Sequence, residues 1–111
     1  MKKFKITVTR TVEYEVEVDE TIYTDEAREG WEDTFFELPG DDSAEAFARG
    51  LAEQSVSLGV NEFIEGFGRV MQYEHQLQWY KQRHNDINEN IFIREINDEI
   101  ESEAEEVEDF Y

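Results

Sequence analysis

Three oxygen-bearing side chains at alternate positions, Asp86, Asn88 and Asn90, are the first candidates for chemistry in this sequence. Their spacing matches the leading ligands of a twelve-residue calcium-binding loop. Such a loop also needs glycine at its sixth position and a bidentate glutamate at its twelfth, where this chain has Ile91 and Asn97. We therefore interpret the segment as a polar loop and helix cap, and we expect no metal ion and no cofactor.

Other catalytic and metal-binding patterns are equally weak. His75 and His84 are the two histidines, and their separation matches no standard zinc spacing. The chain has no cysteine, which excludes thiolate chemistry and disulfides. It has no nucleophile elbow and no phosphate-binding or dinucleotide fingerprint. With 29 acidic residues, close pairs of carboxylates arise by chance. We predict that the protein is not an enzyme.

The charge is the informative feature. The 111 residues fit a single domain, 1–111, and carry 29 acidic and 10 basic side chains, a net charge of −19. A field of this size repels nucleic acid and anionic membranes, so we expect direct contact with neither. Its natural complement is a basic protein. The absence of cysteine, of a signal peptide and of a long apolar run predicts a cytoplasmic protein, in the host cytoplasm if it is encoded by a phage.

The acidity is concentrated in two segments. Residues 21–58 contain ten acidic and two basic side chains, a net charge of −8, and residues 86–111 contain eleven and one, a net charge of −10. Residues 59–85 are neutral, with three side chains of each sign. Evenly distributed acidity would indicate solubility, whereas segregated acidity indicates a directed surface.

The elements that position these acids are predicted from periodicity, and they give an α+β fold. Residues 3–18 alternate between apolar and polar side chains, which is typical of strands. One long bent strand would keep this alternation, but we favour an antiparallel hairpin that turns at 9–11. This hairpin would pack with three to four helices. Thr24 is expected to cap a helix over 25–38, and Asp42 or Ser43 a second helix that ends at Gly59. For 61–67 we favour helix, and for 70–81 helix and strand stay open.

A long acidic helix is predicted over residues 89–108. Ile93, Ile96, Ile100, Ala104 and Val107 are three or four residues apart, as on one face of a helix. The remaining positions are mostly acidic or Asn. Such a helix would form a rod of roughly 30 Å that carries a row of carboxylates.

The run Glu101-Ser102-Glu103-Ala104-Glu105-Glu106-Val107-Glu108-Asp109, together with the size, the charge and the absence of cysteine, resembles phage-encoded DNA-mimic proteins. Those proteins are anti-restriction and anti-CRISPR inhibitors that occupy the nucleic-acid site of a host enzyme. The resemblance implies that this chain inhibits a nucleic-acid-binding host protein. The implied contact residues are Asp25, Glu26, Glu29, Glu32, Asp33, Asp41, Asp42, Glu95, Asp98, Glu99, Glu101, Glu103, Glu105, Glu106, Glu108 and Asp109.

Two further possibilities accompany this hypothesis. The chain could instead be a small interaction module, or an antitoxin-like binder of a basic partner, that does not copy DNA. In that case aromatic anchors such as Phe110 and Tyr111 would contribute most of the affinity. A homodimer is also a possibility, because paired rods would lengthen the decoy.

Overall fold

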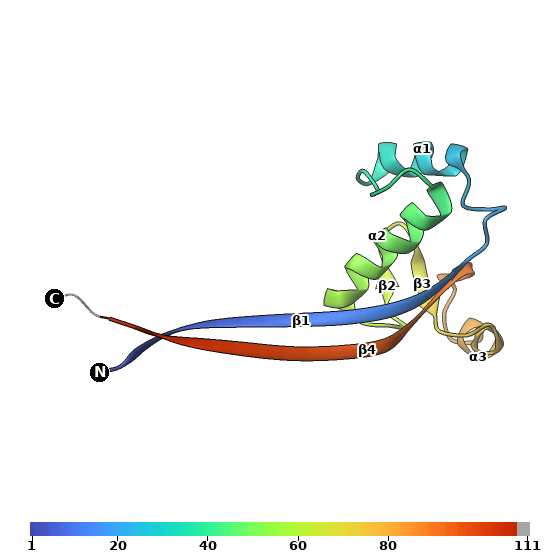
Figure 1. Ribbon diagram of the computed structural model, residues 1–111. Helices are drawn as coiled ribbons and strands as arrows, with labels where there is room; N and C mark the ends of the chain where they lie inside the picture. The colour runs from blue at the N-terminus through green and yellow to red at the C-terminus, as the bar shows by residue number, and fades with distance from the viewer. Residues whose placement is uncertain (109–111) are drawn as a thin grey trace.

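The computed structural model describes residues 1–108, which form an α+β fold around one four-stranded sheet (Figure 1). The strand order is β1-β4-β3-β2. The pairs β1–β4 and β2–β3 are antiparallel, whereas β3 and β4 are parallel. In chain order the elements are β1 (Lys3–Val18), α1 (Asp25–Thr34), α2 (Ser43–Leu58), β2 (Phe63–Ile64), β3 (Gly68–Met71), a 3₁₀ helix η1 (Glu74–Gln76), α3 (Leu77–Lys81) and β4 (Ile87–Val107).

The predicted C-terminal helix over 89–108 is wrong, because this segment forms the 21-residue strand β4. The predicted hairpin over 3–18 is also wrong. Residues 3–18 form one 16-residue strand, β1, which pairs with β4 instead of folding back on itself. A helix would have placed glutamates four residues apart, such as Glu99 and Glu103, next to one another along its surface. Like charges at that spacing are destabilising.

A β-bulge explains why β4 resembles a helix in sequence. Glu13 pairs with Asn97 and Tyr14 with Glu95, so Ile96 is an extra residue in β4. Before the bulge, odd-numbered residues of β4 lie on the same sheet face as the even-numbered residues of β1. After the bulge, even-numbered residues of β4 lie there. This change of parity gives the isoleucines a spacing that imitates helical periodicity.

The two longer helices confirm the predicted caps. The Thr24 hydroxyl accepts a hydrogen bond from the Ala27 amide at 3.2 Å, and α1 begins at Asp25 but ends at Thr34 rather than near 38. The Asp42 carboxylate accepts from the Glu45 amide at 3.1 Å and caps α2. Gly59, with a φ of 87°, ends α2 as predicted.

Residues 61–81 differ from the prediction. The expected helix over 61–67 is wrong, because residues 63–71 form the short hairpin β2–β3. Gly66 and Gly68 have φ values of 89° and 82°, a left-handed conformation that glycine adopts without strain. Residues 70–81, for which helix and strand were both open, contain the end of β3, then η1 and α3.

The buried core lies at one end of the molecule, where α2 covers one face of the sheet and α1 packs on the far side of α2 (Figure 1). Phe47 and Leu51 of α2 pack with Ile91 and Ile93 of β4, and all four side chains are at most 1% exposed. From β1, the residues Tyr14, Val16 and Val18 are partly buried against this core.

The paired strands β1 and β4 extend far beyond the core as a two-stranded ribbon (Figure 1). We define the ribbon as residues 3–13 of β1 and 97–107 of β4. Its length accounts for the elongated dimensions of the molecule, 61 × 32 × 21 Å. The ribbon is therefore a projecting element whose two faces are both accessible to a partner.

Candidate functional site

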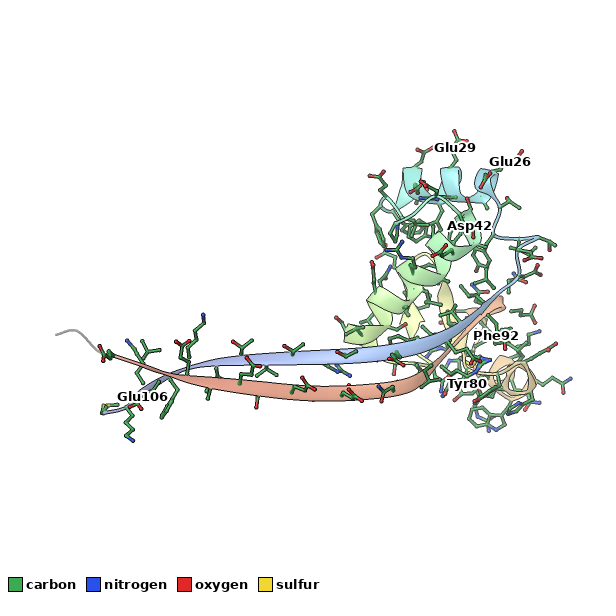
Figure 2. All side chains as sticks on the ribbon, in the orientation of Figure 1. Glu26, Glu29, Asp42, Tyr80, Phe92 and Glu106 are labelled. Atoms are coloured by element: carbon green, nitrogen blue, oxygen red, sulfur yellow. The ribbon has the colours of Figure 1, made fainter. Side chains whose placement is uncertain are left out.

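The acidic residues predicted from the sequence fall into two groups that the fold keeps apart (Figure 2). One group lies on α1 and on the loop before α2, and the other lies on β4. The first group consists of Asp25, Glu26, Glu29, Glu32, Asp33, Asp41 and Asp42. The two groups therefore do not form the single surface that a shared contact role would require.

Three carboxylates of the first group have structural roles. The Ser43 hydroxyl donates a hydrogen bond to Asp25, and Asp42 caps α2. Glu32 accepts hydrogen bonds from the Arg28 guanidinium at 3.2 Å and from the Leu38 amide at 2.7 Å. The remaining members, Glu26, Glu29, Asp33 and Asp41, are exposed. Figure 2 shows Glu26 and Glu29 pointing away from the rest of the protein.

Four glutamates of the second group form a regular row. Glu99, Glu101, Glu103 and Glu105 pair with Thr11, Thr9, Thr7 and Lys5 of β1, so all four lie on the same face of the ribbon. We call this the acidic face. All four are exposed, and within residues 1–108 none of them forms an ion pair. Alternate residues of an antiparallel strand are about 6.8 Å apart, so the row is about 20 Å long.

The other members of the second group lie elsewhere. Glu95, Asp98 and Glu106 pair with Tyr14, Val12 and Phe4, which places them on the opposite face of the β1–β4 pair. Glu108 follows the end of β4. Asp109 lies outside the described residues, as do the expected aromatic anchors Phe110 and Tyr111.

Sequence reasoning missed Glu13, Glu15 and Glu17, which extend the acidic face along β1 towards the core. Glu15 and Glu17 contact the buried guanidinium of Arg94 at 3.4 and 2.6 Å, and this guanidinium also lies 4.6 Å from the Tyr73 ring centre. Glu13 has no such partner among residues 1–108 and adds to the exposed charge. The alternation of glutamates in β1 was the available signal, but the hairpin predicted over 3–18 would have placed residues 13–17 beside residues 3–7 rather than beside β4.

Asp98 is held by Arg10 and is not free for a partner. Arg10 donates from Nε and Nη2 to the two Asp98 carboxylate oxygens at 3.0 and 2.9 Å. Its Nη1 also reaches the Val56 carbonyl oxygen of α2 at 3.5 Å, which ties the ribbon to the helix. The hydrogen bond from Arg10 lowers the pKa of Asp98 below its ordinary value.

We expect Arg10→Met to return the pKa of Asp98 towards the ordinary aspartate value. In the wild type the carboxylate stays charged, and the pair stays intact, until the pH falls through the lowered pKa of the folded state. The measurement is an NMR titration of the Asp98 side-chain carbon. The pKa of Asp19, which the Thr21 hydroxyl and amide lower, serves as the internal control and should not change. An unchanged Asp98 titration in the variant would show that Arg10 does not hold the carboxylate.

The described part of the chain contains no group of three or more His, Asp or Glu side chains arranged to hold a metal ion. His75 stacks on Tyr73 and His84 on Tyr80, with ring centroids 5.4 and 6.2 Å apart. A surface hollow of about 600 Å³ lies beside Arg28, Leu38 and Glu53. Its one guanidinium is already bonded to Glu32 and to the carbonyl oxygens of Leu38 and Gly40.

The chemistry that this surface offers is therefore the recognition of positive charge by a row of carboxylates. Within residues 1–108, no helix combines the length and the apolar character needed to cross a bilayer. Comparisons of the chain with protein-family models, with curated proteins and with solved structures gave no significant match.

Proposed function

We propose that this protein is an acidic decoy that inhibits a nucleic-acid-binding protein, such as a defence nuclease or a CRISPR effector, by occupying its basic cleft. The observation that carries the proposal is the row of Glu99, Glu101, Glu103 and Glu105 on the projecting ribbon. One strand of duplex DNA carries a negative charge every ~3.4 Å along the axis. A carboxylate every ~6.8 Å therefore gives the row about half the axial charge density of one DNA strand.

The setting of the row favours binding to a cleft. The ribbon projects from the core, so it can enter a groove that the wider end of the molecule cannot (Figure 1). Because Glu99, Glu101, Glu103 and Glu105 form no ion pair within residues 1–108, their field is not neutralised and is directed outwards. A cleft lined by Lys and Arg suffers from its own repulsion, and this repulsion is relieved when carboxylates bind.

A second candidate function, a protein-interaction module that does not copy DNA, is favoured by exposed aromatic groups near α3. The Trp79 side chain is 52% exposed, and the Arg83 guanidinium lies 4.0 Å from its ring centre. Tyr73 is 44% exposed, and its ring centre lies 4.6 Å from the Arg94 guanidinium. Exposed Trp, Tyr and Arg are the residue types that dominate hot spots of protein interfaces.

The two candidates predict different behaviour in a pull-down from bacterial lysate. For the decoy, we expect a nucleic-acid-binding protein that elutes as salt rises and that competing duplex DNA releases, because both act on the same charges. A Trp79→Ala variant should retain this partner. Capture of a partner that resists both salt and DNA, and that Trp79→Ala abolishes, would contradict the decoy and support the interaction module.

A further inference from the structure

Among residues 1–108, no strand pairs with the outer edge of β1 along any of its 16 residues. β1 is the first strand in the sheet order, and its one strand partner within residues 1–108 is β4. An open edge of this length presents a row of free backbone amides and carbonyls, which is a template for pairing with another strand. The free edge of β1 can therefore pair with a strand of another chain.

The face of the ribbon opposite the acidic face carries exposed apolar side chains, beside Arg10, Asp98 and Glu106. Phe4, Ile6, Val8 and Ile100 are 52, 55, 64 and 69% exposed. A two-stranded sheet in water is marginally stable at best, and it becomes stable with more strands or with packing against another element. Additional strands beside β1 would supply this stabilisation.

The described part of the sheet has two long free edges, one along β1 and one along residues 93–107 of β4, and their charges determine which of them can pair with a second copy of the chain. Residues 3–15 of β1 contain Lys3, Lys5 and Arg10 against Glu13 and Glu15, a net charge of +1. Residues 93–107 of β4 contain seven acids and only Arg94, a net charge of −6. Repulsion therefore blocks the β4 edge, as charged residues commonly do in natural sheets, while the β1 edge is open to a chain of the same sequence.

β1 is complementary to itself when two copies run antiparallel with Thr9 opposite Thr9. In this register Lys3 faces Glu15 and Lys5 faces Glu13 of the second copy. Phe4 then faces Tyr14, Ile6 faces Val12 and Thr7 faces Thr11. Opposite charges, aromatic pairs and Thr–Thr pairs are the cross-strand pairs that stabilise sheets. Because every pair except Thr9–Thr9 occurs twice, the contact is the isologous type that a twofold axis produces.

Neighbouring registers lose this match. A shift by one residue would pair the apolar face of one copy with the polar face of the other. Shifts by two residues keep the faces aligned. In one direction, however, Arg10 faces Arg10 on the twofold axis. In the other, Lys5 loses its glutamate and faces Thr11.

Pairing in the Thr9 register also places apolar side chains of the second copy beside the exposed apolar side chains of the ribbon. In the Thr9 register, Val8 and Ile6 of the second copy lie beside Arg10 and Val12 of the first. Arg10 contacts the end of α2 at Val56, and the Val56 and Leu58 side chains are 41 and 51% exposed. Both copies keep their apolar faces on the same side of the joined sheet, so each α2 can cover part of the other copy's ribbon.

We propose that this protein forms a symmetric homodimer in which two β1 strands pair antiparallel about Thr9, giving a continuous sheet in the order β4-β1-β1-β4. The evidence for the dimer is the free edge of β1, so the dimer proposal does not depend on the proposed decoy function. It would extend that function, because the two rows of glutamates would run antiparallel on one face. Three strand spacings separate the rows by about 14 Å, which is close to the ~12 Å width of the DNA major groove.

Cysteine cross-linking tests the register directly, because the chain has no cysteine of its own. Cα atoms of facing strand residues are about 4.5–5.5 Å apart, within the range that a disulfide spans. We expect Thr9→Cys to form a covalent dimer under mild oxidation on a non-reducing gel. Thr7→Cys should stay monomeric on the gel, because two copies of residue 7 are four residues out of register. The double variant T7C/T11C should cross-link.

A charge swap followed by light scattering or sedimentation tests the dimer without oxidation. We expect the wild type to have twice the monomer mass of 13.2 kDa. Lys5→Glu should raise the dimer dissociation constant on the order of tenfold or more, because each dimer loses two ion pairs and gains two repulsions. Adding Glu13→Lys should restore dimerisation. The swap leaves the repulsion between residue 5 and Glu105 of the same chain in place, so relief of that repulsion does not explain a rescue.

Three results would overturn the proposal: a monomeric wild type, equal cross-linking at residues 7 and 9, or no rescue by the swap. Lysate pull-downs report on the decoy function and need no dimer. The two proposals can therefore fail separately.

Discussion

Replacing Glu99, Glu101, Glu103 and Glu105 with glutamine is expected to lower the affinity for the basic partner by about 100-fold at low salt. The four carboxylates are exposed on one face and form no ion pair within residues 1–108, so their charge is available to a partner. An exposed charge pair contributes about 0.2–1 kcal/mol. Four such pairs together give about 3 kcal/mol, and every 1.4 kcal/mol is a tenfold change in affinity.

A matched control separates the acidic face from the total charge. Neutralising Glu26, Glu29, Asp33 and Asp41 with the corresponding amides also changes the net charge from −19 to −15. Because these residues lie on α1 and its following loop, away from the ribbon, we expect at most a few-fold loss of affinity. Titration calorimetry at several salt concentrations is the measurement, and the salt dependence should become shallower for the ribbon variant alone.

Equal losses in the two variants would contradict the assignment of the contact to the ribbon. The effect would then come from net charge, which acts at long range and mainly on association rates. Neither variant should be less stable than the wild type, because each removes repulsion between like charges. Thermal unfolding of both variants therefore checks that a loss of affinity does not come from a loss of structure.

Local sequence signals predicted the starts of α1 and α2 and the end of α2, but they placed the end of α1 near residue 38 rather than at Thr34. The Thr24 and Asp42 caps and the Gly59 end were identifiable because each depends on a side chain or a φ angle within a few residues. The strand character of residues 3–18 was also evident from its strict alternation. The partner of that strand was not, because β1 and β4 are separated by the entire remainder of the fold. Pairing at such a separation leaves no local signal.

The acidic face could not be predicted from local sequence signals either. The four glutamates were among the contact residues predicted from the sequence, but a helix would have spread them around its circumference. The extra residue Ile96 shifted the alternation and produced the misleading helical spacing. Strand geometry alone places Glu99, Glu101, Glu103 and Glu105 on one face, so the row could be derived only once β4 was known to be a strand.

Phe47→Ala is expected to lower the free energy of unfolding by about 3–5 kcal/mol, the usual range for truncating a buried aromatic side chain. Phe47 is 1% exposed and lies in the aromatic cluster of the core, with ring centroids 4.7, 5.8 and 6.2 Å from those of Tyr23, Trp31 and Phe67. Its loss would remove contacts to all three. Small domains have about 5–15 kcal/mol of stability in total, so this change is a large fraction of it.

Phe63→Ala is the matched control, because it removes the same side chain from a position that is 52% exposed. We expect a loss of about 0.5 kcal/mol or less for it, as is usual at the surface. Urea unfolding followed by tryptophan fluorescence measures both variants, since Trp31 lies in the cluster. Similar losses in the two variants would show that the core does not centre on Phe47. The ribbon adds no fully buried side chain to that core, so its order depends on the stability of this cluster and on whatever pairs with its free edge.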